Sequence, residues 1–231
     1  MIDENIKSLE TRLEAVCARV GRSRDEITLV AVSKTFGADR IREATKAGLR
    51  DFGENYVQEL TAKNLQLNDL SPRWHFIGHL QSNKVKYIAD FIHLIHSVDN
   101  IRLAREIDTR AERCGRILDV LVEVHTTDEA TKSGARPEET TGLVRQLAAL
   151  GHLRVQGLMT MGPFSDDPND SRPSFRRVAA LAREIEGDGI AGVSMKKLSM
   201  GMTHDFEVAI EEGATLVRIG TAIFGERTRE H

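Results

Sequence analysis

A lysine stands at the end of a short apolar segment, where it could do chemistry. The segment ITLVAVSKT (Ile27–Thr35) is rich in β-branched residues, which predicts a buried strand. Strand periodicity places Val30, Val32 and Lys34 on one face. If that face lines a barrel, the ammonium of Lys34 points into its mouth, where an unpaired charge is costly. Such a lysine is suited to Schiff-base formation, although a lysine that snorkels to the rim fits the same pattern.

An arginine occupies a similar position on the last predicted strand. Leu216, Arg218 and Gly220 share one face of that strand. A guanidinium that points inward needs an acceptor. From the pattern alone, this acceptor is either a ligand or a glutamate such as Glu123, which would make an ion pair inside the barrel.

Two glycine-containing segments near the C-terminus could hold a phosphate. SMGMT (Ser199–Thr203) offers two hydroxyls and a close backbone approach, and Gly220 with Thr221 offers N–H groups and a hydroxyl at a helix-like N-terminus. Barrel enzymes often bind phosphate after strands seven and eight, which is where these segments fall. The alternative for SMGMT is a simple helix N-cap at Thr203.

The elements that must position these residues alternate between strands and helices. Besides the first strand, seven segments are predicted strands: Arg50–Gly53, Trp74–Gly78, His93–Val98, Leu118–Val124, Arg154–Met159, Lys197–Met200 and Leu216–Gly220. Helical patterns lie between them, best marked at Asn100–Arg113, Pro137–Leu150 and Ser174–Glu186. This alternation indicates parallel βα units, which form either a (β/α)8 barrel or an open doubly wound sheet. A count of eight strands in 231 residues favours the TIM-type barrel, an α/β fold.

The first 21 residues are predicted to form an extra helix outside these units. Apolar residues recur there at alternating steps of four and three, from Ile2 to Val20. Because the sequence ends at His231, soon after the eighth strand, this helix is expected to pack on the barrel and cover its seam. We expect residues 1–231 to form a single domain.

Composition excludes several classes of function. Lysine and arginine number 32 against 35 acidic residues, and aromatics make up 5%, so binding to nucleic acid is not expected. No apolar run approaches the ~20 residues of a membrane span. Two cysteines, Cys17 and Cys114, exclude a disulfide framework, and both are expected to be buried. The acidic N-terminal segment is unlike a signal peptide, which indicates a cytoplasmic protein.

The sequence has no recognisable metal or hydrolase motif. No HExxH, GxSxG or GxGxxG occurs among the 231 residues. His93 and His96 are three residues apart and should face opposite sides of a strand. We therefore expect that the histidines do not gather and that no catalytic metal is bound.

Seven segments occur in order along the sequence: VAVSKT, FGENYVQE, WHFIGHLQSNK, KSG, GLMTM, LSMGMTHD and VRIGTAIFG. Together they resemble the YggS/PROSC family of pyridoxal 5′-phosphate (PLP) homeostasis proteins, from the first strand to the C-terminus. The resemblance implies a barrel like the N-terminal domain of bacterial alanine racemase. It also implies a lysine that holds PLP as an internal aldimine.

The resemblance assigns roles to individual residues. Lys34 corresponds to the Schiff-base lysine, Arg218 to an arginine facing the pyridine nitrogen, and Asn55 to a residue beside the cofactor. The implied phosphate end consists of Ser199, Gly201, Met202, Thr203, Gly220 and Thr221. An ion pair between Arg218 and Glu123 thereby becomes the weaker interpretation.

Two positions depart from the family pattern. Thr203 and His204 stand where many members have serine and aspartate. The threonine keeps the hydroxyl, whereas His204 adds a titratable group whose role the sequence does not assign. Lys84 and Lys132 are candidates for a transient second PLP site, with solvated rim charges as the alternative.

Three functions are compatible with these implications: a carrier that holds and delivers PLP, for instance to apo PLP-dependent enzymes, a PLP-dependent amino-acid racemase, and a PLP sensor. An arginine at the ring nitrogen weakens the electron sink that catalysis needs. A racemase also needs a second base, which a second domain supplies in alanine racemase; the sequence ends just past the barrel, and Tyr56 and His204 have no support as bases. We expect a PLP homeostasis protein without catalytic turnover.

Overall fold

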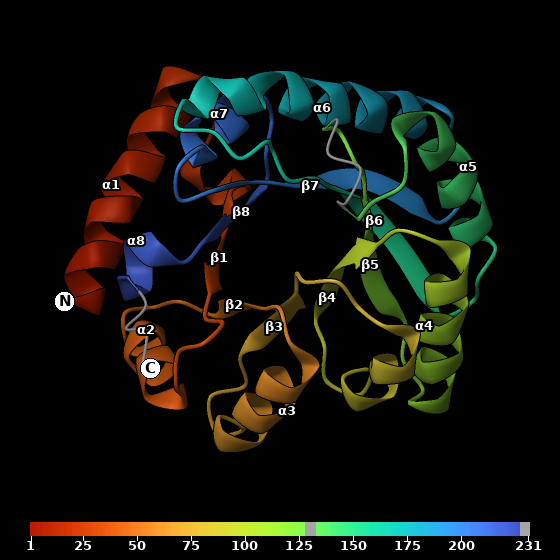
Figure 1. Cartoon of the computed structure of the whole chain (residues 1–231), viewed down its shortest axis with the longest axis horizontal. Helices are drawn as coiled ribbons and strands as arrows, with labels where there is room; N and C mark the ends of the chain where they lie inside the picture. Colours follow the sequence, from red (N-terminus) through yellow and green to blue (C-terminus); the bar gives the residue numbers. More distant parts are fainter. Residues whose placement is uncertain (128–132, 227–231) are drawn as a thin grey trace.

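Eight parallel strands close into a barrel in the computed structural model, which describes residues 1–127 and 133–226 (Figure 1). The strands are β1 (Thr28–Val32), β2 (Asp51–Glu54), β3 (Arg73–Phe76), β4 (Leu94–Val98), β5 (Leu118–Glu123), β6 (Leu153–Met159), β7 (Val193–Met202) and β8 (Leu216–Ile219). Each pairs with the next, and β8 pairs with β1 so that Arg218 lies opposite Val30. The predicted barrel is confirmed, and the open sheet is excluded.

Helices surround the barrel on its outer side (Figure 1). The α-helices are α1 (Ile2–Arg19), α2 (Ala38–Lys46), α3 (Val57–Gln66), α4 (Ile101–Arg113), α5 (Pro137–Ala148), α6 (Arg172–Gly187), α7 (Phe206–Glu211) and α8 (Thr221–Phe224). Three short 3₁₀ helices are η1 (Arg24–Glu26), η2 (Ser82–Tyr87) and η3 (Pro168–Ser171). Strands β3 and β4 are joined through η2 instead of an α-helix.

The strands separate two apolar layers. Alternate residues of β1 show why: Leu29 and Ala31 pack in the large outer cluster with the helices, whereas Val30 belongs to a small inner cluster. The inner cluster consists of Val30, Leu94, Leu121, Met159 and Leu216. The face of β1 expected to line the barrel does so.

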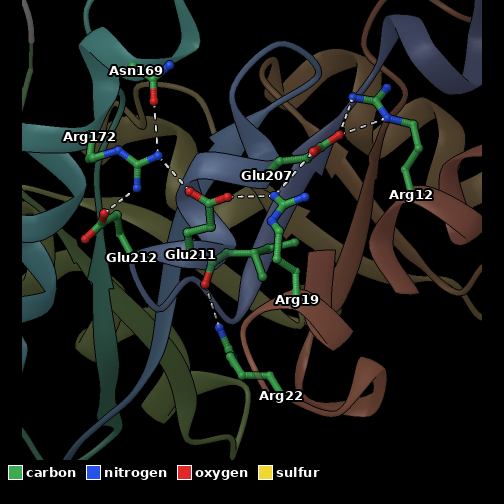
Figure 2. A network of polar contacts seen from close by, with 9 residues as sticks. Arg12, Arg19, Arg22, Asn169, Arg172, Glu207, Glu211 and Glu212 are labelled. Atoms are coloured by element: carbon green, nitrogen blue, oxygen red, sulfur yellow. Dashed lines mark hydrogen bonds and ion pairs between the residues drawn. The ribbon is translucent and has the colours of Figure 1, made fainter. Parts of the chain in front are cut away.

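Helix α1 covers the outer side of α7 and α8, as the sequence predicts for a seam-covering helix (Figure 1). Its apolar stripe is buried, and Asn5 Nδ2 donates to the Ile223 carbonyl of α8 at 2.9 Å. Figure 2 shows the polar contacts between α1 and α7. Arg12 pairs with Glu207 at 2.8 Å, and Arg19 pairs with Glu211 at 2.6 Å. These contacts fasten the N-terminal helix to the last βα unit.

The same network continues into α6 (Figure 2). Arg172 contacts Glu211 and Glu212, each at 2.6 Å, and Arg22 Nη1 donates to the carbonyl of Ala214 at 2.8 Å. Because Glu211 contacts both Arg19 and Arg172, one carboxylate of α7 connects α1 with α6.

Some details differ from the sequence-based expectations. The first strand ends at Val32, so Lys34 lies in a turn, and β7 begins at Val193, four residues earlier than expected. Cys17 is buried as expected, but Cys114 is exposed because it caps the end of α4. None of the described helices is both long and apolar enough to cross a membrane.

Candidate functional site

A cavity of about 450 Å³ opens at the carboxyl ends of β1, β2, β7 and β8. Seven of the nine predicted site residues line it: Lys34, Asn55, Met202, Thr203, Arg218, Gly220 and Thr221. Apolar side chains, among them Val32, Phe36 and Ile77, form the rest of the wall. The structure thus brings together residues that are up to 187 positions apart in the sequence, from Lys34 to Thr221.

Lys34 lies in a tight turn directly after β1. The Phe36 N–H donates to the Ser33 carbonyl at 3.1 Å, which makes Lys34 and Thr35 the central residues of the turn. Thr35 has a φ of 69°, a left-handed conformation that costs energy for a β-branched residue. Its N–H donates to Glu59 Oε2 at 2.8 Å, and this contact holds the strained residue in place.

A buried ion pair supports the other side of this turn. Lys63 Nζ lies 2.6 Å from Glu54 Oε1 and donates to the Ser33 carbonyl at 2.8 Å. The Ser33 hydroxyl also donates to Glu54 Oε1 at 2.6 Å. Burial raises the pKa of Glu54, while Lys63 opposes that shift. The backbone on both sides of Lys34 is therefore anchored by side chains of β2 and α3.

Asn55 presents a buried acceptor without a partner among the described residues. Its Oδ1 is shielded from solvent, and the residue lines the cavity just after β2. A side chain at Gly78 would collide with the Asn55 backbone, because a Cβ there would lie 2.4 Å from the Asn55 carbonyl oxygen. Buried acceptors without a donor are rare, so this arrangement of Asn55 beside the cavity is an unusual one.

Arg218 is buried beneath the cavity. Its guanidinium donates to the Ser199 carbonyl at 2.7 Å, to the Ser199 hydroxyl at 2.5 Å and to the Thr160 carbonyl at 2.9 Å. Burial lowers its pKa to about 10, and the charges of Asp205 and Glu123 oppose this shift. No ion pair joins Arg218 to Glu123 among the residues described, so the alternative of a barrel ion pair is not realised.

Glu123 is a second buried titratable group at this end of the barrel. It is 4% exposed, and burial raises its pKa to about 7. The nearby carboxylate of Asp99 adds to this shift, and Arg218 opposes it. A protonated Glu123 is therefore substantially populated at neutral pH.

A line of hydrogen bonds runs from Arg218 through the barrel interior. The Ser199 hydroxyl contacts His96 Nδ1 at 2.8 Å, His96 Nε2 contacts His75 Nδ1 at 2.9 Å, and His75 Nε2 contacts Asp51 Oδ1 at 2.9 Å. We call these five residues the interior network. The expectation that the histidines do not gather is wrong, because neighbouring parallel strands bring His75 and His96 together.

The two ends of the interior network determine its polarity. Arginine can only donate and an ionised aspartate can only accept, so each residue between them accepts on one side and donates on the other. His96 and His75 therefore carry their protons on Nε2. Burial keeps the pKa of His96 well below its ordinary value and also lowers that of His75, so both rings are neutral.

Ser199 belongs to this network and not to the cavity wall. It is fully buried, and its hydroxyl contacts Arg218 and His96. The geometry therefore does not favour the prediction that Ser199 binds a phosphate. Ser199 faces inward on β7, and its hydroxyl is already bonded to Arg218. Gly201 does not line the cavity either; it has a φ of 89° and lets β7 pass close to Phe206 of α7.

Two threonine hydroxyls lie together on the wall of the cavity where β7 ends and α8 begins. Thr221 Oγ1 donates to Thr203 Oγ1 at 3.2 Å, next to Gly220 at the start of α8. The first N–H groups of a helix have no acceptor within the helix. The Met202 N–H, by contrast, donates to Asp205 Oδ1 at 2.7 Å, so this member of the predicted phosphate end is already engaged.

The remaining candidates lie at or outside the rim. His204 lines the cavity and donates from Nε2 to the Asp166 carbonyl at 2.8 Å, which joins the β7–α7 connection to the loop before η3. Tyr56 is 55% exposed and is not part of the wall. Lys84 lies over the Tyr87 ring in η2, away from the cavity, and Lys132 lies outside the described residues.

Sequence reasoning missed several residues that hold this site. Glu54, Glu59 and Lys63 fix the turn of Lys34, and His96 and Thr160 fix Ser199 and Arg218. The only available signal was strand periodicity, which places His96 on the inward face together with Leu94.

The residues of the mouth fit PLP. The cavity holds an amine, a buried cationic donor and paired hydroxyls around an apolar wall, and PLP carries an aldehyde, a ring nitrogen and a phosphate on an apolar ring.

Comparison with known proteins identifies the family. The family "Alanine racemase, N-terminal domain" matches residues 5–228. The chain is 46% identical to a pyridoxal phosphate homeostasis protein of Aquifex aeolicus over 97% of both chains, and 39% identical to that of Escherichia coli over 98% of this chain and 97% of the relative.

Solved structures agree with this relationship. PipY of Synechococcus elongatus with PLP bound superimposes with a TM-score of 0.85 at 34% identity, covering 97% of this chain and all of that one. Alanine racemase of Clostridium difficile shares the fold at a TM-score of 0.74 and 14% identity, and this chain spans 58% of its length. The chain therefore belongs to the pyridoxal phosphate homeostasis protein family, whose barrel is that of the alanine racemase N-terminal domain.

Proposed function

We propose that this protein binds PLP in the mouth cavity and takes part in PLP homeostasis by holding and releasing the cofactor. The observation that carries the proposal is the meeting of Lys34, Asn55, Arg218 and Thr221 on one cavity of about 450 Å³. The full-length relatives named for PLP homeostasis, and PipY with PLP bound, support it. On this proposal residues 1–231 act as one PLP-binding domain.

Each residue has a separable task. PLP supplies an aldehyde that bonds covalently to an amine, and Lys34, on its anchored turn, is the amine. Arg218 donates a hydrogen bond to the ring nitrogen and cannot protonate it, because arginine stays cationic. Thr203, Thr221 and the first N–H groups of α8 bind the phosphate. Asn55 contacts the ring from the cavity wall.

Binding and release are favoured over amino-acid turnover. A donor-only partner at the ring nitrogen leaves it unprotonated, which weakens the electron sink that carbanion chemistry uses. His204, the one titratable residue on the wall that could oppose Lys34 among the described residues, is already hydrogen-bonded to Asp166. The relatives are named for homeostasis and not for a reaction. Apo PLP-dependent enzymes are the partners that would receive the cofactor.

The first experiment measures the visible absorbance of the purified protein before and after borohydride reduction, followed by peptide mapping. We expect a yellow protein with label on Lys34, and no covalent label in Lys34→Ala. Lys84→Ala is the matched control, because Lys84 lies in η2, away from the cavity. In this variant the label on Lys34 should be unchanged. If the unaltered protein were labelled on another lysine and not on Lys34, the assignment would be refuted.

A second experiment separates a carrier from a racemase. The holoprotein is mixed with an apo PLP-dependent enzyme, and recovered activity is followed beside deuterium exchange at Cα of L- and D-amino acids. A carrier restores the activity and exchanges no deuterium at a useful rate. Rapid exchange without transfer would identify a small racemase instead.

A further inference from the structure

Three metal-ligating side chains meet at the end of the barrel opposite the mouth. Asp51 begins β2, His75 lies on β3, and His93 directly precedes β4. One donor atom from each lies within 4.8 Å of the other two. Asp51 and His75 are buried, whereas His93 is exposed.

The three residues face a cavity that has room for an ion and its remaining ligands. This cavity measures about 450 Å³ and is lined mainly by polar side chains, including Glu26, Thr28 and Thr215. It is separated from the mouth cavity, with which it shares no lining residue.

The partners that orient metal ligands in proteins are already present. The second ring nitrogen of His75 contacts His96 Nε2 at 2.9 Å, and the second oxygen of Asp51 is bonded to Arg73. Metal-bound histidines commonly have such a partner on the other nitrogen, which fixes the ring orientation. Both buried ligands are therefore held from behind. Their outer atoms, His75 Nε2 and Asp51 Oδ1, are hydrogen-bonded to each other at 2.9 Å, a contact that a bound ion would replace.

We propose that Asp51, His75 and His93 bind one divalent transition-metal ion of the zinc class. Two imidazoles and one carboxylate form an open zinc site, in which water completes the tetrahedron. Three cations line this cavity, Arg73, Lys196 and Lys197, and their charge weakens the site. Arg73 is bonded to the second oxygen of Asp51, and Lys197 lies 3.9 Å from Asp119, which offsets part of that charge.

Metal binding would reverse the interior network. A metal on His75 Nε2 requires the proton of this neutral ring to move to Nδ1, which then donates to His96 Nε2. The His96 proton moves to Nδ1 in turn and donates to the Ser199 hydroxyl oxygen, whose own proton must turn away from His96. No proton is gained or lost in either ring, so two tautomer changes carry the effect of the metal as far as Ser199, the residue that contacts Arg218.

The test titrates Zn²⁺ into the full-length, metal-free protein by calorimetry and follows the histidine ring nitrogens by ¹⁵N NMR. We expect one equivalent to bind and the protonated nitrogen of His75 to change from Nε2 to Nδ1. His93→Ala should weaken binding by at least about tenfold. Because His93 is exposed, this substitution leaves the buried core unchanged.

Two further variants make the test specific. His79→Ala removes an exposed histidine outside this cavity and should leave the affinity unchanged. Lys197→Ala removes a nearby cation and should tighten binding severalfold. Absence of stoichiometric binding to the unaltered protein, or equal binding by His93→Ala, overturns the proposal.

Discussion

The two ends of this barrel differ in the kind of polar group that they bury. The mouth holds cationic donors, Lys34 and Arg218, against a largely apolar wall. The opposite end holds an anion, Asp51, among imidazoles and charged side chains. An apolar inner cluster fills part of the space between them, and the interior network crosses the rest.

This difference bears on how a buried arginine is tolerated without an ion pair. Arg218 donates to a hydroxyl and two carbonyls, and the charges of Asp205 and Glu123 stabilise its positive charge without a hydrogen bond to either carboxylate. Aligned hydrogen bonds polarise one another, so a neutral serine and two neutral histidines connect the charges of Arg218 and Asp51. The two ends together therefore fix the tautomers of the histidines between them.

The largest expected effect comes from removing the anion. Asp51→Ala leaves the His75 N–H without its acceptor and Arg73 without its partner. We expect the free energy of unfolding to fall by about 3 kcal/mol, because a buried donor loses its charged acceptor. Urea denaturation measures it. As a control, Asp69→Ala breaks an exposed pair with Arg42 and should lower the free energy of unfolding much less. Equal losses would contradict the role of the network.

The next prediction concerns a substitution that disturbs the packing of β7 against α7 near the mouth and removes no side chain of the interior network. Gly201→Ala places a Cβ 2.5 Å from Ala209 Cβ and 2.9 Å from Phe206 Cα, at a φ of 89°. Strain and overpacking together should lower the free energy of unfolding by about 3 kcal/mol and weaken PLP binding. Gly142→Ala, with open space in α5, should instead stabilise by about 0.5–1 kcal/mol. Thermal unfolding with and without PLP distinguishes the two.

Glu123 gives the mouth a pH dependence of its own. Its pKa of about 7 lies above the unfolded value of 4.5, so between these pH values the native state keeps a proton that the unfolded state has released. The free energy of unfolding therefore falls as the pH rises from 4.5 to 7. Glu123→Gln should remove a penalty of about 3 kcal/mol at pH 8 and change little at pH 4. Urea denaturation at several pH values tests this sign. Glu112→Gln, on the exposed side of α4, should leave the pH profile unchanged.

The smallest effect separates the two ends. Ser199→Ala removes one acceptor of Arg218 and the donor to His96, while the backbone contacts of Arg218 remain. We expect a loss of about 1–3 kcal/mol in stability and a weaker retention of PLP. Calorimetric PLP titration measures the second effect. Unchanged PLP affinity together with normal stability would mean that the ends act independently.

Much of the fold follows from the sequence because its signals are local. Apolar β-branched runs mark the eight strands within a few residues, and the stripe from Ile2 to Cys17 marks the helix that covers the seam. Strand periodicity also predicts that Val30 and Arg218 face inward. Seven predicted residues meet on one cavity because parallel strands present their carboxyl ends on the same side.

What the sequence by itself determined is therefore the order of the elements, the inward faces and the residues at the mouth. Only the tertiary structure decided which inward side chains touch. The interior network joins Asp51, His75, His96, Ser199 and Arg218 from five strands, with contacting partners up to 103 positions apart. Its contacts depend on the stagger of the strands around a closed barrel. No local pattern of residues in the sequence predicts that stagger. For the same reason Ser199 was expected at the cavity, whereas closure of the barrel commits it to Arg218 and His96.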